Sequence, residues 1–303
     1  GMGGSAIGAS LARDLAGPEC SFPVHVERGY SLPGFAGPDS TVISISYSGN
    51  TEEILALFRQ AEELGCSLGA ITSGGRLEAE AEGSGAGAVV VTGGLPPRAA
   101  IGCLFAPLVR ILSGWGALKV DERDVEELIR TLRGALESLS PDMPDNPALR
   151  ISEQLHGKIP LIYSGGGLLE AAAYRWKCQF NENSKVMAFN NFFPELGHNE
   201  VMGWDSPGNV REVLSVIMLT DRDDHPRVSR RMEITASMLE DLGVEVIRVD
   251  SSWFQEGSSS RLERLLSTVS LGDMASVYLA LRRGVDPVPI ERIETVKNKL
   301  RTE

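Results

Sequence analysis

Residues 42–53 constrain the fold of this chain more than any other stretch, because an alternating apolar run passes directly into small hydroxyl residues and then into a helical pattern. The pattern predicts a strand, a loop and the start of a helix. The loop carries the hydroxyls of Ser46, Ser48 and Thr51. Together with the free amide N–H groups at the helix start, they predict a binding site for an anion such as a phosphate.

A helix cap is the competing interpretation of this loop. Asn50, with Glu53 three residues later, has the spacing of a capping box, in which side chains satisfy the first helical N–H groups without any ligand. Capped helices follow strands throughout α/β proteins. The loop alone therefore leaves both interpretations open.

Short apolar runs alternate with helical stretches along the whole chain, which is the pattern of βαβ units and a mostly parallel sheet. A length of 303 residues suggests two domains. Residues 140–147 contain three prolines and no periodicity, so we place a linker at 141–147, between domains at 1–140 and 148–303. The sequence thus predicts an α/β protein of two doubly wound, flavodoxin-like domains. The strands are expected near residues 24–27, 42–46, 68–72, 88–91, 159–163, 211–221 and 244–250.

The second half of the chain repeats the pattern of the first. Residues 159–168 form a strand and a glycine turn similar to residues 1–7, but residues 219–222 stand where the first half has its serine-rich loop. Only the first half is therefore predicted to bind the anion. Because no strand precedes the turn from Gly1 to Ser5, we expect that an N-terminal segment is missing from this chain. The turn lacks the full G-x-G-x-x-G spacing, which disfavours a dinucleotide site.

Charge and composition exclude several partners. The net charge of −12 argues against a nucleic acid or an anionic membrane, since no basic patch offsets it. No apolar run approaches the roughly 18 residues of a membrane helix. The four cysteines show no paired spacing, so we expect free thiols and a cytoplasmic protein. The histidines are isolated from one another, so we expect neither a metal nor another cofactor.

Ionisable residues among aromatic ones mark a second candidate region. Glu182 and His198 lie in a stretch rich in Phe and Trp, where a polar group is costly unless it is paired or used. Arg98 stands at a predicted helix start, which normally prefers an acid, so a bound anion would explain it. Lys297 is better placed than Lys299 to reach a pocket, because it lies beside the apolar stripe of a C-terminal helix. That stripe, predicted to be buried, consists of Ile290, Ile293, Val296 and Leu300.

Each of these side chains also has a plainer interpretation. Arg98 could be a solvated surface arginine, Glu182 a helix-end carboxylate in water, and His198 a hydrogen-bonded loop histidine. The residue types alone do not separate these interpretations from a catalytic one.

Several segments, in their order along the chain, resemble the bifunctional phosphoglucose/phosphomannose isomerase family, whose members consist of two sugar-isomerase (SIS) domains. The resemblance spans nearly the whole chain. The motifs at 181–185 and 194–200 are specific to the family, whereas the serine loop is shared by all SIS proteins. The motifs are G-M-G-G-S at 1–5, S-Y-S-G-N-T-E-E at 46–53, P-R at 97–98, N-E-N-S-K at 181–185, P-E-L-G-H-N-E at 194–200 and the tail at 286–297.

The resemblance implies a metal-independent isomerase that interconverts glucose 6-phosphate, and mannose 6-phosphate as well, with fructose 6-phosphate. It also implies a homodimer in which a histidine from the neighbouring subunit completes each site. The roles that it implies are phosphate binding by Gly4, Ser5, Ser46, Ser48 and Thr51, stabilisation of the enediolate by Arg98, proton transfer by Glu182, and ring opening by His198 and Lys297.

Two other functions remain to be weighed. A non-catalytic SIS sensor of sugar phosphates would be expected to carry a DNA-binding helix pair or a basic arm, and these residues contain neither. Another SIS isomerase would act on an amino sugar or a hexulose phosphate. The glutaminase domain of the amino-sugar synthases is absent here, and the hexulose-phosphate isomerases usually have a single SIS unit.

Overall fold

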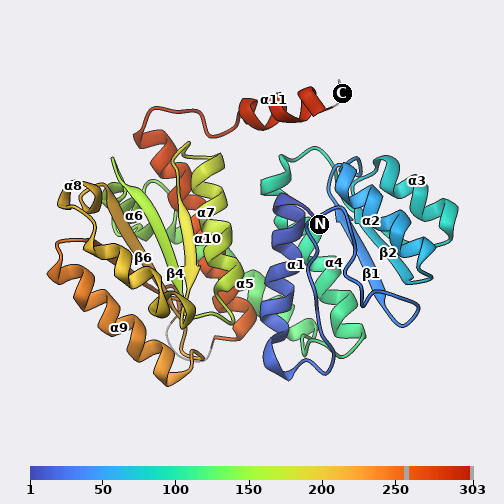
Figure 1. The fold of residues 1–303 in the computed structure, drawn as a ribbon, viewed down its shortest axis with the longest axis horizontal. Coiled ribbons are helices and arrows are strands. Elements are labelled where there is room, and N and C mark those ends of the chain that lie inside the picture. The colour runs from blue at the N-terminus through green and yellow to red at the C-terminus, as the bar shows by residue number, and fades with distance from the viewer. Residues whose placement is uncertain (256–258, 301–303) are drawn as a thin grey trace. The chain divides into compact units, whose positions relative to one another are not determined.

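The computed structural model describes residues 1–255 and 259–300, and it divides the chain into two compact units, Gly1–Val125 and Glu126–Glu303. Each unit is a parallel sheet flanked by helices, as the sequence predicted (Figure 1). The division falls within helix α5 (Glu122–Ser138). The proline-rich residues 141–147, which we expected to separate the domains, lie inside the second unit.

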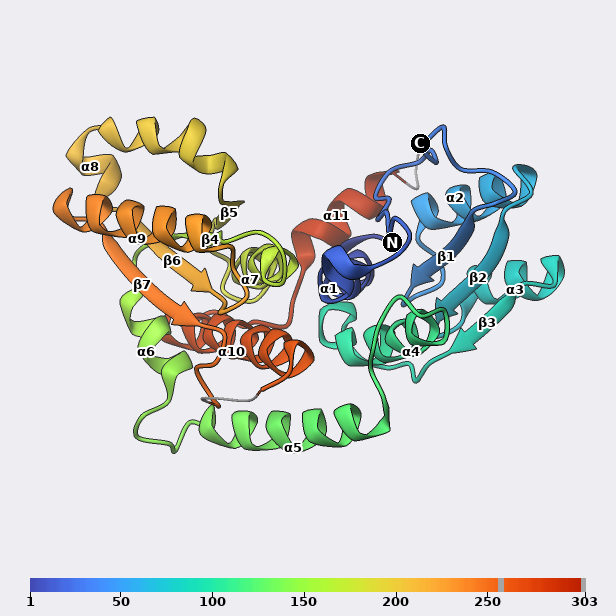
Figure 2. The same cartoon turned by 90° about the horizontal axis from the view of Figure 1, so that it is seen from below.

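The first unit contains three parallel strands in the order β1-β2-β3. Helices α2 and α3 connect them, as parallel neighbours require a crossover, and cover one face of the sheet, while α1 and α4 cover the other (Figure 2). The elements are β1 (Thr41–Ser46), β2 (Ser67–Thr72), β3 (Gly87–Val90), α1 (Gly3–Ala16), α2 (Glu52–Glu63), α3 (Gly75–Ser84) and α4 (Ile101–Gly114), with short 3-10 helices η1 (Gly17–Glu19) and η2 (Pro97–Ala99).

The strand expected near residues 24–27 does not form, so that prediction is wrong. The segment is extended, but its hydrogen bonds are not those of a strand ladder. The amino group of Gly1 donates to the carbonyl of Glu27 at 3.1 Å. The Glu27 carboxylate accepts from the next two backbone N–H groups, of Arg28 and Gly29, so these groups are not available to a neighbouring strand.

The second unit contains four parallel strands in the order β5-β4-β6-β7, which is 2-1-3-4 in sequence order and agrees with the flavodoxin-like arrangement. Helix α9 covers one face, and α7 and α10 cover the other, with α6 packed on α10 (Figure 2). The elements are β4 (Ile159–Ser164), β5 (Phe189–Phe192), β6 (Leu214–Thr220), β7 (Glu245–Asp250), α6 (Pro147–Gln154), α7 (Glu170–Glu182), α8 (Gly208–Arg211), α9 (Pro226–Asp241), α10 (Arg261–Arg282), α11 (Glu291–Leu300), η3 (Glu195–His198) and η4 (Glu200–Asp205).

Helices α7 and α10 pack unusually closely. The indole of Trp176 is fully buried and donates to the carbonyl of Thr268 at 2.9 Å. A Cβ placed on Gly272 would lie 2.2 Å from that ring, so only glycine fits there. Nearby, the buried guanidinium of Arg175 pairs with Asp273 at 2.6 Å. These contacts fix the helix whose last residue is Glu182.

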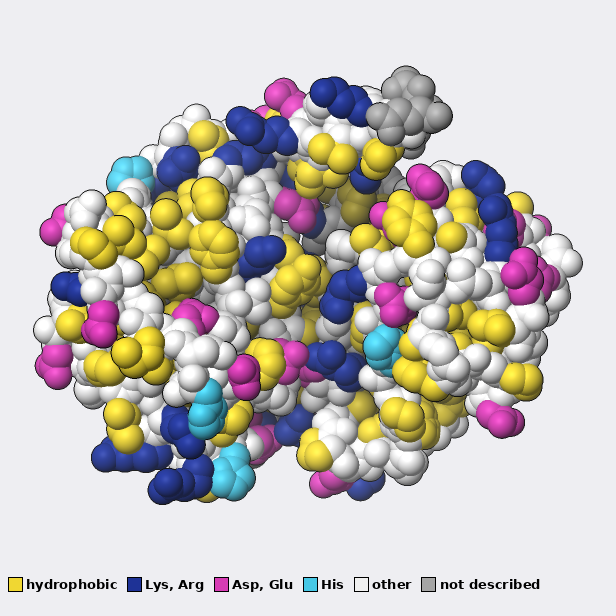
Figure 3. Space-filling view, in the orientation of Figure 1, with side chains coloured by type: hydrophobic (Ala, Val, Ile, Leu, Met, Phe, Trp, Pro, Cys, Tyr) yellow, Lys and Arg dark blue, Asp and Glu magenta, His cyan; other side chains and the backbone are white. Residues whose placement is uncertain are grey.

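Helix α11 behaves differently from our expectation. None of its residues is buried, and Ile293, Val296 and Leu300 are 40, 60 and 58% exposed. Its apolar side chains are visible at the surface in Figure 3. The buried stripe predicted for this helix is therefore wrong for the described chain, because an amphipathic pattern shows which face would be buried without supplying the surface that covers it.

None of the helices in residues 1–255 and 259–300 combines the length and the apolar character needed to cross a membrane.

Candidate active site

The loop at the carboxyl end of β1 gathers the hydroxyl groups that the sequence singled out. Ser46 is the last residue of the strand and is 1% exposed, and its Oγ lies 2.8 Å from Oγ1 of Thr51. Thr51 is the N-cap of α2, yet its side chain makes no cap hydrogen bond. Ser48 is exposed, and its Oγ accepts from the N–H of Asn50 at 3.3 Å. Two of the three loop hydroxyls are thus held together at a helix start that no side chain caps.

The capping box proposed as an alternative for this loop does not form. The amide of Asn50 faces away from α2: its Nδ2 donates to the carbonyl of Ser48 at 2.9 Å, and its Oδ1 accepts from the N–H of Arg76 at 3.2 Å. Asn50 therefore braces the loop against the start of α3. No side chain caps this helix start, so its first N–H groups remain available to an anion.

The start of α1 reaches the same loop. Oγ of Ser5 accepts from the N–H of Tyr47 at 3.3 Å, which joins α1 to the end of β1. Gly4 packs against η2, since a Cβ on it would lie 3.0 Å from the Pro97 carbonyl oxygen and 3.6 Å from Cα of Arg98. Arg98 is only 9% exposed, so the solvated surface arginine is not what the structure contains. The fold therefore brings Gly4, Ser5, Ser46, Thr51 and Arg98 into one cluster of connected segments.

Gly49 explains why this loop can be so compact. Its φ is +65°, and a Cβ on it would lie 1.7 Å from the carbonyl oxygen of Gly74. The Gly49 carbonyl also accepts from the N–H of Leu77 at 2.9 Å. The loop after β2 thus clamps the hydroxyl-bearing loop, and a larger residue at 49 would push the two apart.

Glu182 is the final residue of α7 in the second unit and is half-buried. Its carbonyl accepts from Nζ of Lys185 at 2.5 Å. Burial raises the pKa of the Cys178 thiol one turn earlier, and the Glu182 carboxylate adds to that shift, so Cys178 stays protonated beside it. Glu182 therefore lies at the end of a firmly packed helix.

His198 is the last residue of η3 and is exposed. Two hydrogen bonds anchor the loop that carries it to the sheet: the carboxylate of Glu200 accepts from the hydroxyl of Tyr163 in β4 and from Nδ2 of Asn191 in β5. Burial and the Glu200 carboxylate raise the pKa of Tyr163, so its hydroxyl keeps the proton that it donates. Sequence reasoning missed this network. The only signal for it was Glu200 within the motif at 194–200.

Lys297 lies in α11 and is exposed. Within the described ranges, the side chains of Lys297 and His198 make neither a hydrogen bond nor an ion pair. The hydrogen-bonded loop histidine, offered as the plainer interpretation of His198, is thus not observed. Glu182, His198 and Lys297 lie on three separate segments of the second unit. In the described residues, no hydrogen bond or ion pair links the side chain of His198 or of Lys297 to the other two.

The carboxyl end of β6, which corresponds to the serine loop in the repeated pattern, is filled by a buried ion pair. Nε of Arg264 donates to Asp221 at 2.8 Å, and both side chains are almost fully buried. Ser251 and Arg264 both donate to Asp221 Oδ2, and Arg264 also pairs with Asp223 at 2.5 Å. A cation and an anion of the chain itself occupy this place.

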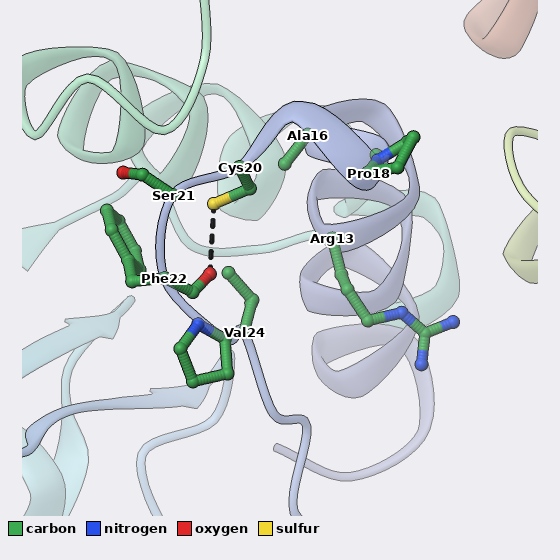
Figure 4. Close-up of a pocket in the computed structure, with 9 residues that line it drawn as sticks. Arg13, Ala16, Pro18, Cys20, Ser21, Phe22 and Val24 are labelled. Carbon is green, nitrogen blue, oxygen red and sulfur yellow. Dashed lines mark hydrogen bonds between the residues drawn. The ribbon is translucent and has the colours of Figure 1, made fainter.

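A pocket of about 340 Å³ lies at the other end of α1 (Figure 4). Its one cation, Arg13, already pairs with Asp14 at 2.7 Å, and Cys20 Sγ donates to the carbonyl of Phe22. None of the candidate phosphate-binding residues lines it. We therefore do not assign the candidate site to this pocket. Across the part of the chain that the structure describes, no three His, Cys, Asp or Glu side chains form a group that could hold a metal.

Comparison with known proteins identifies close relatives. A family model described as the bacterial phospho-glucose isomerase C-terminal SIS domain matches residues 144–300. A bifunctional phosphoglucose/phosphomannose isomerase from Caldicellulosiruptor bescii is 39% identical over 99% of this chain and 88% of its own length. Another from Aquifex aeolicus is 38% identical over 99% of this chain and 89% of its own length.

A solved structure supports the fold. The C-terminal domain of glucosamine-fructose-6-phosphate aminotransferase from Francisella tularensis superposes with a TM-score of 0.68, covering 94% of this chain and 83% of that chain. Its sequence is 17% identical, so the likeness concerns the fold alone.

Proposed function

This chain belongs to the bifunctional phosphoglucose/phosphomannose isomerase family, and from that premise we propose that it interconverts glucose 6-phosphate and mannose 6-phosphate with fructose 6-phosphate. The observation that carries the proposal is the cluster at the end of β1, where Ser5, Ser46 and Thr51 meet two helix starts that no side chain caps. Hydroxyl groups and free helix N–H groups are the donors that a phosphate dianion requires.

The phosphate serves as an anchor and does not react. Gly4, Ser5, Ser46, Ser48 and Thr51 hold it, and binding energy gained at this remote end orients the first two sugar carbons. The close approach of Gly4 to η2 supports this role, because a side chain there would fill the space beside Arg98.

The chemical steps are ring opening and a proton transfer between C2 and C1 through a cis-enediol. His198, helped by Lys297, acts at the ring oxygen and the anomeric hydroxyl. Glu182 removes the proton from one carbon and returns it to the other, and the guanidinium of Arg98 stabilises the negative charge that develops on the enediolate. All four groups are protein side chains, so the reaction is proposed to need no metal.

We further propose that both units are SIS domains and that the active protein is a homodimer sharing its sites. The parallel sheets flanked by helices support the first point. The exposed position of His198 supports the second, because an exposed histidine is available to a neighbouring subunit. A sensor without catalytic activity is not favoured, since the relatives are named as isomerases.

Replacing Glu182 tests the proposal. Glu182→Gln keeps the shape of the side chain and removes its basicity, so turnover of fructose 6-phosphate should fall about 10²–10⁴-fold. Binding of fructose 6-phosphate, followed by calorimetry, should change little because the phosphate is held elsewhere. Glu170→Gln, at the other end of α7, is the matched control and should keep wild-type activity. Each assay is run with and without EDTA, and activity that disappears with EDTA contradicts the metal-free mechanism.

Equal turnover by wild type and Glu182→Gln would remove Glu182 as the base. Tight binding of fructose 6-phosphate by the wild type without any turnover would instead favour the sensor.

A further inference from the structure

Lys185 has an unusual backbone conformation immediately after α7. Its φ is +54°, and no other non-glycine residue in the described ranges has a positive φ. Residues with a Cβ seldom adopt this conformation, and helices that end this way usually place glycine or asparagine there. A lysine in this strained conformation is therefore expected to make side-chain contacts that offset the cost of its positive φ.

The ammonium group of Lys185 makes such contacts, and they join two segments that are far apart in the sequence. Nζ donates to the carbonyl of Glu182 at 2.5 Å, to that of Pro289 at 2.7 Å and to that of Pro287 at 3.3 Å. An ammonium has three donors and no acceptor, so these three carbonyls match its capacity. The Glu182 carbonyl lies at a helix C-terminus, where the helix dipole also attracts a cation.

The end of α7 is anchored without this lysine. Nδ2 of Asn183 donates to Oγ of Ser276 at 2.9 Å, and Oγ of Ser184 donates to the carbonyl of the same residue at 2.6 Å. Both contacts bind the end of α7 to α10, and both side chains are buried. What the Lys185 ammonium adds is therefore a connection to residues 287–289.

Residues 287–289 lead directly into α11, which carries Lys297. Helix α11 has ten residues and buries none of them. So short a helix gains little stability from its own hydrogen bonds, and the point at which it starts decides where its side chains reach. A contact that holds residues 287–289 is thus also a contact that places α11.

We propose that Lys185 is a positioning residue, whose ammonium holds residues 287–289 against the carbonyl end of α7 and so sets Lys297 relative to Glu182. The contact itself is independent of the proposed function, whereas its effect on catalysis rests on that function.

Three substitutions separate the ammonium from the backbone. Lys185→Met keeps the aliphatic stem and removes the charge, Lys185→Gly also relieves the positive φ, and Lys185→Arg keeps a cation. The matched control is Lys158→Met, because Nζ of Lys158 is likewise a surface ammonium on a backbone carbonyl, that of Glu212 at 2.6 Å.

Hydrogen–deuterium exchange gives a readout that does not depend on activity. We expect faster exchange in residues 285–300 of Lys185→Met and Lys185→Gly, and wild-type exchange there in Lys185→Arg and Lys158→Met. Unchanged exchange in both the Met and the Gly variants would overturn the proposal. So would an equal rise in the Lys158 control.

A double-mutant cycle tests whether Lys185 acts through Lys297. Lys185→Met should lower kcat for fructose 6-phosphate about tenfold while KM changes less than about twofold, because the phosphate is gripped by the first unit. In a Lys297→Ala background the same substitution should have almost no further effect. Lys158→Met should leave kcat unchanged in both backgrounds.

The outcomes distinguish this inference from the proposed function. A full tenfold loss in the Lys297→Ala background, or recovery of activity in Lys185→Gly, contradicts the positioning role even when Glu182→Gln is inactive. Conversely, an active Glu182→Gln together with faster exchange in Lys185→Met overturns the proposed role of Glu182 as the base and leaves the contact established.

Discussion

Asp224 lies beside the carboxyl end of β6, and burial raises its pKa from 3.8 to about 6. The carboxylates of Asp221, Asp223 and Asp250 add to the shift, and the hydrogen bond from the N–H of Asp221 partly opposes it. The folded state therefore holds this proton more tightly than the unfolded chain does. The resulting penalty to the folded state grows as pH rises from about 4 to about 6 and is constant above that range.

Asp224→Asn is accordingly expected to stabilise the protein at neutral pH. The amide oxygen can still accept from the N–H of Asp221, and no charge has to be buried. The free energy of unfolding should rise by about 1–2 kcal/mol above pH 6. The loss of stability that Asp224 causes between pH 4 and pH 6 should be absent in the variant. Denaturant titrations at pH 4, 5, 6 and 7.5 measure this. Asp142→Asn, at an exposed position of the same unit, is the control. A variant no more stable than wild type at pH 7.5 contradicts the prediction.

Single residues also show how far the sequence could define the site. The pattern of a strand that ends in hydroxyl residues before a helix predicts that Ser46 and Thr51 lie together, and their hydroxyl oxygens are 2.8 Å apart. Ser5 and Arg98 come from other segments, α1 and η2, so this local pattern could not place them beside the loop. The role of Lys185 was not predictable, although it lies three residues from Glu182, because two of its three partners are carbonyl groups about a hundred residues later. Backbone carbonyls carry no residue-specific signal.

At the scale of elements, the sequence predicted the strands at 42–46, 68–72, 88–91, 159–163, 211–221 and 244–250, which the structure contains with slightly different bounds, and it missed β5 (Phe189–Phe192). Residues 24–27 have the same apolar alternation, but the Glu27 carboxylate competes for the backbone N–H groups that follow it. The capping box at Asn50 failed for a similar reason, since Asn50 bonds to Arg76 in another element. Local patterns predict the elements, and contacts between elements decide which local option is realised.

The packing of α7 on α10 yields a prediction at this scale. Gly272→Ala should destabilise the protein by about 1–3 kcal/mol, because the added Cβ would lie 2.2 Å from the buried indole of Trp176. The matched control is Gly83→Ala in α3, where a Cβ meets nothing within 4 Å. That substitution should be neutral or stabilise by up to about 1 kcal/mol, since alanine favours a helix over glycine. Thermal unfolding of the two variants should move in opposite directions, and a shared direction would refute the packing argument.

At the scale of the whole molecule, the proposed shared site predicts complementation between inactive subunits. Glu182→Gln and His198→Ala each abolish both sites of a homodimer. When the two are co-expressed, half of the dimers should be mixed, and each mixed dimer has one site with both residues intact. The preparation should then show about a quarter of wild-type activity, by the symmetry of a two-fold dimer.

Separate tags allow the mixed dimer to be isolated and assayed with fructose 6-phosphate. Activity no higher than that of the two inactive homodimers would mean that Glu182 and His198 act within one subunit. Co-expression of Glu182→Gln with Glu170→Gln controls for dimer exchange, because its mixed dimer has one wild-type Glu182 whichever subunit supplies the histidine.

The buried pair of Arg264 and Asp221 has a consequence for how the chain responds to its substrate. In the second unit this pair fills the carboxyl end of the sheet, whereas in the first unit no side chain caps the helix that follows β1. The carboxyl end of the second sheet is therefore held in place before any sugar phosphate binds. Ordering on substrate binding is therefore expected at the carboxyl end of the first sheet, and little is expected at that of the second.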